Sequence, residues 1–485
     1  MNRDSLAGMD TIKRLHFIGI GGVGMSGIAQ LCLARGYKVS GSDIKASSMS
    51  EVLLRAGAQI HIGHRAENLG DAELIIISSA ISATNPELQE AHARGLQIRK
   101  RAEVLGWLMS DRYGIAVAGA HGKTTTTSLV SRVLEAGHLD PTLIVGGEVM
   151  ATKSNVRFGK SSYVVVEADE SDASFLYLPA KIAIVTNIDD DHMDHYRTVE
   201  RMDQTYVDFI NNLGPDGLAV LCIDNPRLKG LIPRINVPFL TYGFSEDADV
   251  RASDLSWEGR LWSFHVNHLG TDLGRFEISL PGRHNVQNAL SSVAVAMKSG
   301  VDPVDIRNGL ESFTGVKRRF QFVGEAQDIS VYDDYAHHPT EIKATLESAR
   351  LCRPGRLVVL FQPHRFSRTR LLASEFGRSF SDADLVILLP VYAAGESDDG
   401  VTSDLIYREL VKNHPYVVAI ENNGRELRSL VPLIASQLEA GDWVFTVGAG
   451  DVTQLGGMLI KQLQKVVLGG IGADTFPALE VALNT

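Results

Sequence analysis

A short segment with two glycines, a lysine and threonines follows an apolar run and has the composition of a phosphate-binding loop. It reads Gly-Ala-His-Gly-Lys-Thr-Thr over residues 119–125. The usual loop has a further glycine five positions before the Gly-Lys pair, and Val117 stands there, so this loop is shortened. We expect its backbone N–H groups to surround phosphates, Lys123 to reach the terminal phosphates and Thr124 to bind Mg²⁺. A glycine-rich helix cap with a solvated lysine is the weaker alternative, because propensity alone does not place four threonines at a helix start.

Two acidic runs, residues 167–172 and 187–192, each follow a hydrophobic strand. Because parallel strands end at the same edge of a sheet, we expect both runs beside the phosphate loop. Carboxylates with one imidazole, as in Glu167 and His192, suit Mg²⁺ or Mn²⁺ better than Zn²⁺. A zinc pair of His192 and His195 is the weaker interpretation. Solvated charge remains an alternative for single members of the runs, but not for the whole set.

A second glycine motif, Gly19, Gly21 and Gly24, lies between a strand and a helix, and Asp43 follows about twenty residues later. Such glycines let the backbone approach a pyrophosphate, which the helix N-terminus binds. The alternative is a tight turn without a ligand. The strand context favours a phosphate-bearing nucleotide, whose identity the residues leave open.

Clusters of polar residues follow glycines or strands further along the chain. They are residues 283–289, 317–320, 333–339 and 364–368. Arginine binds carboxylate and phosphate groups bidentately, so Arg319, Arg365 and Arg368 are candidates for anionic substrate groups. For any one of them a solvated surface charge is the simpler interpretation, and their clustering favours function.

Alternating apolar runs and amphipathic segments carry these motifs, a pattern typical of parallel sheets covered by helices. Three such blocks begin near residue 15, near residue 115 and after residue 320. We therefore predict an α/β protein of three domains, with boundaries near Arg112 and Gly315. The third block repeats the alternation of the first, and the central block carries the phosphate loop on a parallel sheet.

Composition excludes several classes of protein. The 485 residues are enough for about three domains. A net charge of −11 disfavours binding to a nucleic-acid backbone. No run approaches the roughly 18 apolar residues of a spanning helix, and the N-terminus lacks the apolar core of a signal peptide. Three isolated cysteines form neither a disulfide framework nor a zinc cluster, which fits a reducing cytoplasm. We expect a cytoplasmic protein that binds neither nucleic acid nor membrane.

The residues alone support an ATP-dependent phosphoryl-transfer enzyme that acts on a nucleotide-linked acid or a similar metabolite. An NAD-dependent oxidoreductase that uses the first glycine motif would leave the Lys123 loop unexplained. A non-catalytic nucleotide sensor conflicts with the intact set of Lys123, Glu167 and His192.

The motifs and their order resemble those of the Mur ligase family over roughly residues 12–452. They are HFIGIGGVGMSGIA, AGAHGKTTTT, EADESDASF, TNIDDDHMDHY, PGRHNVQNA, DDYAHHPTEI, FQPHRFSRTR and VYAAGE. The resemblance implies a UDP-sugar-binding Rossmann-like domain over residues 1–112 and a central ATP-binding domain over 113–315. It also implies a Rossmann-like domain over 316–485 that closes on the ATP and amino-acid site.

The resemblance further implies roles for individual residues. Lys123, Arg319, Asp334 and His337 would be catalytic, with His337 a candidate general base. ATP would be bound by Gly119, Ala120, His121, Gly122, Lys123, Thr124, Thr125, Asn285, Asn288, Arg319 and Asp334. The UDP-sugar would be bound by Gly19, Gly21, Gly22, Gly24, Asp43 and Ser78. His337, Arg365 and Arg368 would hold the substrate carboxylate or alanine, and Thr124, Glu167 and His192 would bind the metal.

Within the family, the signatures are most similar to those of the enzyme that joins L-alanine to the lactyl carboxylate of UDP-N-acetylmuramate in peptidoglycan precursor synthesis. That likeness implies ATP and Mg²⁺, with Mn²⁺ as an alternative, an acyl-phosphate intermediate, and a monomer or homodimer. The rival is the ligase that attaches a recycled tripeptide to the same nucleotide sugar, and only the acceptor pocket distinguishes them. Some later-step relatives use a carbamoylated lysine near the metals, which cannot be transferred because no lysine lies between Lys181 and Lys229.

Overall fold

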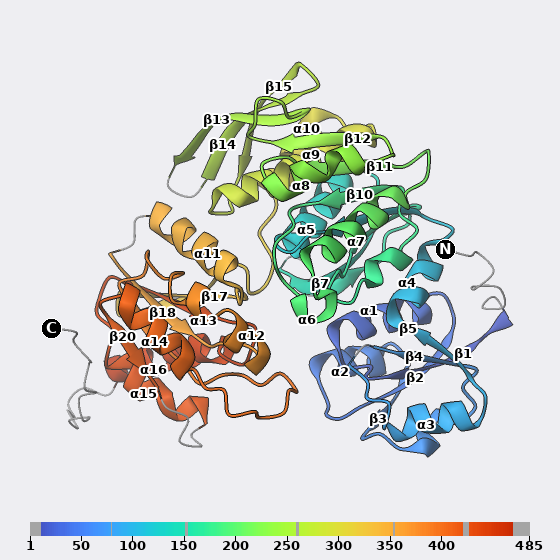
Figure 1. The fold of residues 1–485 in the computed structure, drawn as a ribbon, viewed down its shortest axis with the longest axis horizontal. Helices are drawn as coiled ribbons and strands as arrows, with labels where there is room; N and C mark the ends of the chain where they lie inside the picture. Colours follow the sequence, from blue (N-terminus) through green and yellow to red (C-terminus); the bar gives the residue numbers. More distant parts are fainter. Residues whose placement is uncertain are drawn as a thin grey trace. The chain divides into compact units, whose positions relative to one another are not determined.

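The computed structural model describes residues 11–78, 80–150, 154–258, 261–352, 355–420 and 426–468. Within them, helices alternate with the strands of three sheets, which confirms the predicted three-domain α/β class (Figure 1). The chain divides into two compact units. The first runs through Ser256 and adds Ser263–Ile278 and Val286–Thr314, and the second comprises Trp257–Trp262, Ser279–Asn285 and the chain from Gly315.

The N-terminal sheet is parallel throughout, with the strand order β3-β2-β1-β4-β5. Its strands are β1 (Arg14–Ile18), β2 (Lys38–Asp43), β3 (Gln59–Ile62), β4 (Leu74–Ile77) and β5 (Gln97–Lys100). Its helices are α1 (Val23–Ala34), α2 (Ser48–Arg55), η3 (Ala66–Leu69), α3 (Pro86–Ala93) and α4 (Arg101–Met109). The apolar runs become the central strands because both of their faces are covered, so Phe17 and Ile75 are fully buried. The first glycine motif joins β1 to α1.

The central sheet has the order β15-β14-β13-β12-β11-β10-β6-β9-β7-β8. Its strands are β6 (Tyr113–Ala118), β7 (Thr142–Val149), β8 (Ser154–Arg157), β9 (Tyr163–Glu167), β10 (Ile182–Val185), β11 (Leu218–Cys222), β12 (Phe239–Gly243), β13 (Val250–Glu258), β14 (Leu261–His268) and β15 (Thr271–Ile278). The accompanying helices are α5 (Lys123–Ala136), η4 (Ser174–Tyr177), α6 (Met193–Tyr196), α7 (Val199–Asn211), α8 (Pro226–Leu231), η5 (Ile232–Arg234), α9 (Arg283–Lys298) and α10 (Pro303–Glu311).

Strand β6 leads into the phosphate loop and pairs in parallel with β9 on one side and β10 on the other. Val117 lies opposite Glu167 on β9, and Ala118 lies opposite Val185 on β10. The two acidic runs therefore begin on either side of the phosphate loop, as the sequence predicts.

Two close contacts fasten the helices of the N-terminal sheet to the central sheet. The buried side chain of Asn155 on β8 donates an amide N–H to the carbonyl oxygen of Val23 at the start of α1, at 2.8 Å. On α4, Gly106 lies so close to η4 that a Cβ there would be 2.3 Å from the carbonyl oxygen of Tyr177. Both contacts lie within the first compact unit.

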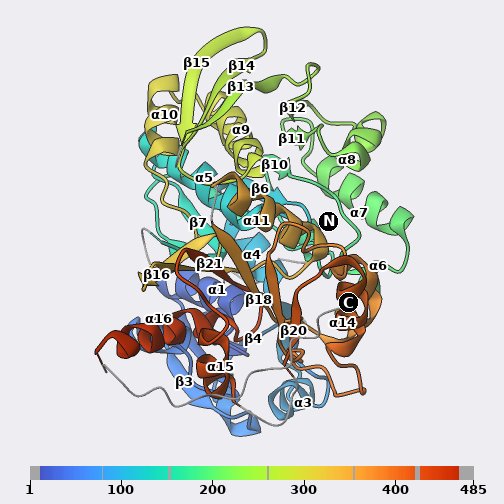
Figure 2. The same cartoon turned by 90° about the vertical axis from the view of Figure 1, so that its left-hand side faces the viewer.

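The second unit holds the sheet β16-β17-β21-β18-β19-β20, in which β16 is antiparallel to β17 and the other pairs are parallel. Its strands are β16 (Gln321–Ala326), β17 (Ile329–Asp334), β18 (Arg356–Phe361), β19 (Leu385–Leu388), β20 (Val417–Ala419) and β21 (Asp442–Val447). Its helices are α11 (Pro339–Leu351), α12 (Phe366–Leu371), α13 (Ala373–Phe376), α14 (Asp404–Asn413), η6 (Leu427–Leu430), α15 (Val431–Ala435) and α16 (Thr453–Leu468). Helices α15 and α16 pack together against one apolar face of this sheet, and α11 packs against the opposite face (Figure 2).

The central strands β17, β21 and β18 of this sheet are neighbours, so their carboxyl ends bring distant motifs together. The segment after β17 begins at Tyr335 and the segment after β18 at Gln362. Of the helices in the described part of the chain, none is long and apolar enough to span a bilayer.

We predict that G106A lowers the free energy of unfolding by about 1–3 kcal/mol, because the added methyl group must displace the η4 backbone or move α4. The matched control is G230A, since Gly230 is also helical and a Cβ there meets no atom within 4 Å. That control should change stability by no more than about 1 kcal/mol. Differential scanning calorimetry compares the two, and a G106A transition at the wild-type temperature would contradict the close packing.

Candidate active site

The phosphate loop joins β6 to α5, and two glycines with positive φ give it its shape. Gly119 has a φ of 134° and Gly122 a φ of 82°. A Cβ on Gly119 would lie 2.1 Å from Oγ1 of Thr186, and one on Gly122 would lie 2.9 Å from Oδ1 of Asn288. Both positions therefore require glycine. Gly122 is the N-cap of α5, and no side chain accepts a hydrogen bond from the first turn of this helix. The N–H groups of that turn can therefore donate to a phosphate.

The end of β10 fixes the tip of this loop. The backbone N–H of His121 donates to Oδ1 of Asn187 at 2.9 Å, and the Thr186 hydroxyl donates to the His121 carbonyl at 2.6 Å. The His121 ring places Nε2 2.8 Å from Oδ2 of Asp189. Asp189 is thus a partner of the loop rather than a solvated charge.

Lys123 is held inside the loop by three oxygen atoms. Its Nζ lies 2.6 Å from Oε1 of Glu170, 2.6 Å from the carbonyl oxygen of Gly119 and 3.2 Å from that of Ala120. Burial lowers the pKa of Lys123, but Glu170 and the neighbouring Glu167 outweigh that effect and raise it. Lys123 therefore stays protonated, as a phosphate-binding lysine must.

The predicted metal ligands form two contacts at this edge of the sheet. Thr124 donates its hydroxyl to Oε1 of Glu167 at 3.1 Å, and Oε2 of Glu167 accepts the N–H of Gly146 at 2.7 Å. His192 places Nε2 3.7 Å from Oε1 of Glu170. Among the described residues, Oε2 of Glu170 is a buried acceptor without a hydrogen-bond partner. This set of carboxylate and hydroxyl oxygens with one imidazole fits a Mg²⁺ ion.

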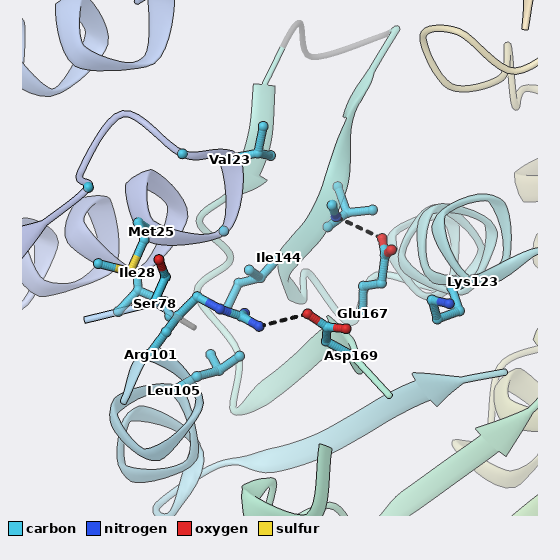
Figure 3. Close-up of a pocket in the computed structure, with 15 residues that line it drawn as sticks. Val23, Met25, Ile28, Ser78, Arg101, Leu105, Lys123, Ile144, Glu167 and Asp169 are labelled. Carbon is cyan, nitrogen blue, oxygen red and sulfur yellow. Dashed lines mark hydrogen bonds and ion pairs between the residues drawn. The ribbon is translucent and has the colours of Figure 1, made fainter. Parts of the chain in front are cut away.

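One cavity of about 350 Å³ is lined by glycines of the first motif and by Lys123 of the phosphate loop. Its lining includes Gly19, Gly22, Gly24 and Ser78 from the N-terminal sheet and Lys123 and Glu167 from the central sheet. Figure 3 shows Arg101 and Asp169 pointing toward one another across it, with Nη2 of Arg101 3.0 Å from Oδ2 of Asp169. The two predicted nucleotide sites therefore open into the same space.

The remaining predicted residues of the first motif, Gly21 and Asp43, bond to each other, with the Gly21 N–H 2.9 Å from Oδ2 of Asp43. The N–H groups of residues 19 and 20 donate to the carbonyl of Ser42 at 2.8 and 3.0 Å, and that of Gly22 donates to the carbonyl of residue 19 at 3.3 Å. The amides of residues 19–22 are therefore already paired, three of them with the end of β2 and one within the loop. A pyrophosphate has the first-turn N–H groups of α1 available to it, since no side chain caps that helix.

The two asparagines predicted to bind ATP lie on the first turns of α9, and both are buried. Asn288 has its side-chain oxygen next to Gly122, at the start of α5. Asn285 donates its side-chain N–H to the carbonyl of Pro281 at 2.7 Å. Asn288 therefore lies next to the phosphate loop, and Asn285 lies about one helical turn before Asn288 on α9.

In the second unit, Asp334 is a buried carboxylate whose two oxygens accept the N–H groups of Phe320 and Ala336, at 2.7 and 2.8 Å. Burial raises the pKa of Asp334 and outweighs the opposing charge of nearby Arg319, so the pKa is about 6. The guanidinium of Arg319 lies over the ring of Tyr335, 5.2 Å from its centroid. Through the N–H of Phe320, Asp334 holds the segment that follows Arg319, and its contact with ATP stays a prediction.

Histidines and arginines meet at the ends of β17 and β18. The rings of His337 and His364 are 5.8 Å apart, and His364 stacks on Tyr392 at 5.7 Å. Nη1 of Arg368 lies 3.5 Å from Nδ1 of His364, and Arg365 precedes α12 with a φ of 72°. Burial and, to a smaller extent, the cationic neighbours lower the pKa of His364 from 6.5 to about 3. The structure thus brings His337 and Arg368 into one cluster around His364.

Two residues of the site were not assigned roles by the motifs. Glu170 lies in the acidic run, but no spacing rule shows that Glu170 faces Lys123. Arg101 follows a lysine and another arginine in a segment that reads as solvated charge. The guanidinium of Arg101 reaches the cavity because α4 packs against η4 of the central domain.

The fold and cavity define an α/β protein of the nucleotide-binding class, with a phosphate loop and a second glycine motif that line one space. Three family models match in order: the "Mur ligase family, catalytic domain" over residues 14–113, the "Mur ligase middle domain" over 117–296 and the "Mur ligase, glutamate ligase domain" over 318–450. The chain belongs to the Mur ligase family.

Curated relatives extend that likeness along the chain. A UDP-N-acetylmuramate–L-alanine ligase of Geobacter sp. (strain M21) is 47% identical over 457 residues, covering 93% of this chain and 98% of the relative. One from Myxococcus xanthus is 46% identical over 458 residues, covering 94% and 96%.

Solved structures resemble the fold. The UDP-N-acetylmuramate-alanine ligase of Thermotoga maritima has a TM-score of 0.77 at 28% identity, with 94% of this chain and 99% of that chain covered. A murein peptide ligase from Psychrobacter arcticus has a TM-score of 0.71 at 23% identity, with 95% and 100% covered, and shows the same fold.

We predict that His364 stays neutral at pH 5. Because folding lowers its pKa from 6.5 to about 3, the stability it contributes is complete above pH 6.5 and is lost as the pH falls toward 3. NMR of ¹³C-labelled histidine, assigned with H364N, gives the titration midpoint. In R368Q the titration midpoint of His364 should rise, because a neighbouring positive charge is removed. A wild-type midpoint near 6.5 would contradict the burial of His364 among cationic side chains.

Proposed function

We propose that this chain joins L-alanine to the lactyl carboxylate of UDP-N-acetylmuramate and converts ATP to ADP and phosphate, in the assembly of peptidoglycan precursors. The observation that carries the proposal is the shared cavity. Lys123 and Glu167 of the phosphate-loop site line it together with Gly24 and Ser78 of the first glycine motif. A phosphoryl donor and a nucleotide-linked acid bound at these sites would meet in one space.

The chemistry proceeds in two transfers. The carboxylate oxygen of UDP-N-acetylmuramate attacks the γ-phosphorus of ATP, the bond to the bridging oxygen breaks, and ADP leaves. The amine of L-alanine then attacks the acyl carbon, loses a proton and expels phosphate. Lys123 is protonated and lies at the loop, so it can offset the repulsion between two approaching anions.

Magnesium would be held by Thr124, Glu167 and His192, with Glu170 beside them. When bound, it would neutralise charge on the phosphates. The fit rests on the paired oxygens of Thr124 and Glu167 and on the unpartnered Oε2 of Glu170.

The second unit supplies the remaining groups in this proposal. Arg319 would engage ATP, while Arg365 and Arg368 would hold the carboxylate of alanine or of the muramoyl group. His337 is the candidate base for the amine, and its Nδ1 lies 3.0 Å from the carbonyl oxygen of Tyr335.

The three rival functions have less support. The tripeptide ligase is represented by a structural neighbour at 23% identity, whereas curated relatives at 45–47% identity are named as alanine ligases. An oxidoreductase would leave the Lys123–Glu170 pair without a role. A nucleotide sensor would not need Thr124 and Glu167 in contact. We place the reaction in the cytoplasm, in accord with three free cysteines.

The first test is phosphate release with ATP, Mg²⁺ and UDP-N-acetylmuramate in the presence of L-alanine, glycine, L-serine or the recycled tripeptide, with product masses determined. We expect turnover that depends on L-alanine. Turnover only with the tripeptide would move the chain to the sister reaction. No turnover with any acceptor would favour the sensor.

A second test separates the two nucleotide sites. K123A should lower turnover by roughly 100-fold or more, because the charge nearest the transferred phosphoryl group is lost. Its dissociation constant for UDP-N-acetylmuramate should stay within about twofold of the wild-type value, as measured by calorimetry. The matched control is K181A, since Lys181 is exposed and lies immediately before β10, and that variant should keep full turnover. Loss of UDP-sugar binding in folded K123A would contradict separate sites.

A further inference from the structure

Beneath the first glycine motif lies a carboxylate that solvent does not reach. Glu87, in the first turn of α3, is 0% exposed. Its Oε2 accepts the hydroxyl of Ser42 at 2.5 Å and lies 3.2 Å from Nε2 of His16. Its Oε1 accepts the side-chain N–H of Asn68 at 2.6 Å and the backbone N–H of Arg65 at 3.1 Å. Both oxygens are therefore saturated by groups from three different segments.

These partners require an ionised carboxylate. Burial alone would raise the pKa of Glu87. The hydrogen bonds with His16, Ser42 and Asn68 outweigh that effect, so the pKa is lowered to about 2. A charge without these donors would be costly to bury, so the donors must remain in place for the domain to fold. His64 extends the network, with Nδ1 2.9 Å from Oγ of Ser42.

Ser42 connects this network to the loop that lines the cavity. Its side chain bonds to Glu87, while its backbone carbonyl accepts the N–H groups of Gly19 and Ile20. The next residue, Asp43, accepts the N–H of Gly21. A displacement of Ser42 would therefore move three consecutive loop amides, and Gly19 is part of the cavity wall.

We propose that Glu87 is a positioning residue for the nucleotide sugar: through Ser42 it sets the backbone of residues 19–21 against which UDP-N-acetylmuramate binds. This inference rests on the proposed function, because it takes UDP-N-acetylmuramate as the ligand of that loop. Glu87 touches no substrate and acts only through the residues around it. The hydrogen bonds of the phosphate loop run instead to Asn187, Glu170 and Glu167 of the central domain.

The isosteric variant E87Q tests the proposal. It keeps the shape of the side chain but turns one oxygen into an N–H₂ group, which faces either Asn68 and Arg65 or Ser42 and His16 as a second donor. Calorimetry on the full chain should show UDP-N-acetylmuramate bound at least tenfold more weakly. Binding of a non-hydrolysable ATP analogue should stay within twofold, and kcat at saturating UDP-sugar should stay within threefold.

Two further variants keep the test decisive if E87Q does not fold. E90Q is the matched control on the same helix, where Glu90 is only partly buried, and it should bind both nucleotides as the wild type does. S42A removes the hydroxyl link and should weaken UDP-sugar binding severalfold on its own. If Glu87 acts through Ser42, the double variant should bind no more weakly than E87Q, so the losses should not add.

The outcomes separate the inference from the proposed function. Wild-type UDP-sugar affinity in E87Q or S42A would overturn the inference, as would equal losses for UDP-sugar and ATP analogue, which indicate general damage. Additive losses in the double variant would overturn the route through Ser42. Failure of the wild-type chain to bind UDP-N-acetylmuramate would instead remove the proposed function on which the inference rests.

Discussion

A positive charge that is mostly withdrawn from water must be balanced, and the arrangement of the central domain depends on how Lys123 meets this requirement. Glu170 supplies the carboxylate at 2.6 Å, and the carbonyls of Gly119 and Ala120 complete the set. These carbonyls face Nζ of Lys123 because the backbone at Gly119 has a positive φ, which residues with a Cβ rarely adopt. Glu170 is within reach because β9 pairs directly with β6. One ion pair thus links the loop conformation, the strand order and the chemistry of phosphate binding.

Local patterns were sufficient to predict the alternating elements. Apolar runs in the third block became β18, β19, β20 and β21, and the strand before the phosphate loop became β6. The position of the acidic runs beside that loop was also predictable, because parallel strands place their carboxyl ends together. In each case the signal lay within a few residues of the element that it described, so no knowledge of distant contacts was needed.

The roles of particular charged residues required the tertiary structure. The acidic run from Glu167 offers several carboxylates, and which one reaches Lys123 depends on the turn that follows β9. Asp43 was predicted from its spacing after the glycine motif, but the spacing did not reveal that its carboxylate accepts the N–H of Gly21. His16 and Glu87 are separated by 71 positions in the chain, so no local pattern could indicate that they are in contact. Polar residues whose partners are remote in sequence remain the part of a site that spacing alone does not reveal.

The hydrogen bond from Asn155 to Val23 has a mechanical consequence. Separating the N-terminal sheet from the central sheet would leave a buried amide unpaired, at a cost of about 1–3 kcal/mol, and would break the tight seam at Gly106. The boundary between these two domains is therefore a poor hinge. The two glycine motifs, one at the start of α1 and one at the start of α5, are therefore held at a fixed separation by packing that does not depend on a ligand.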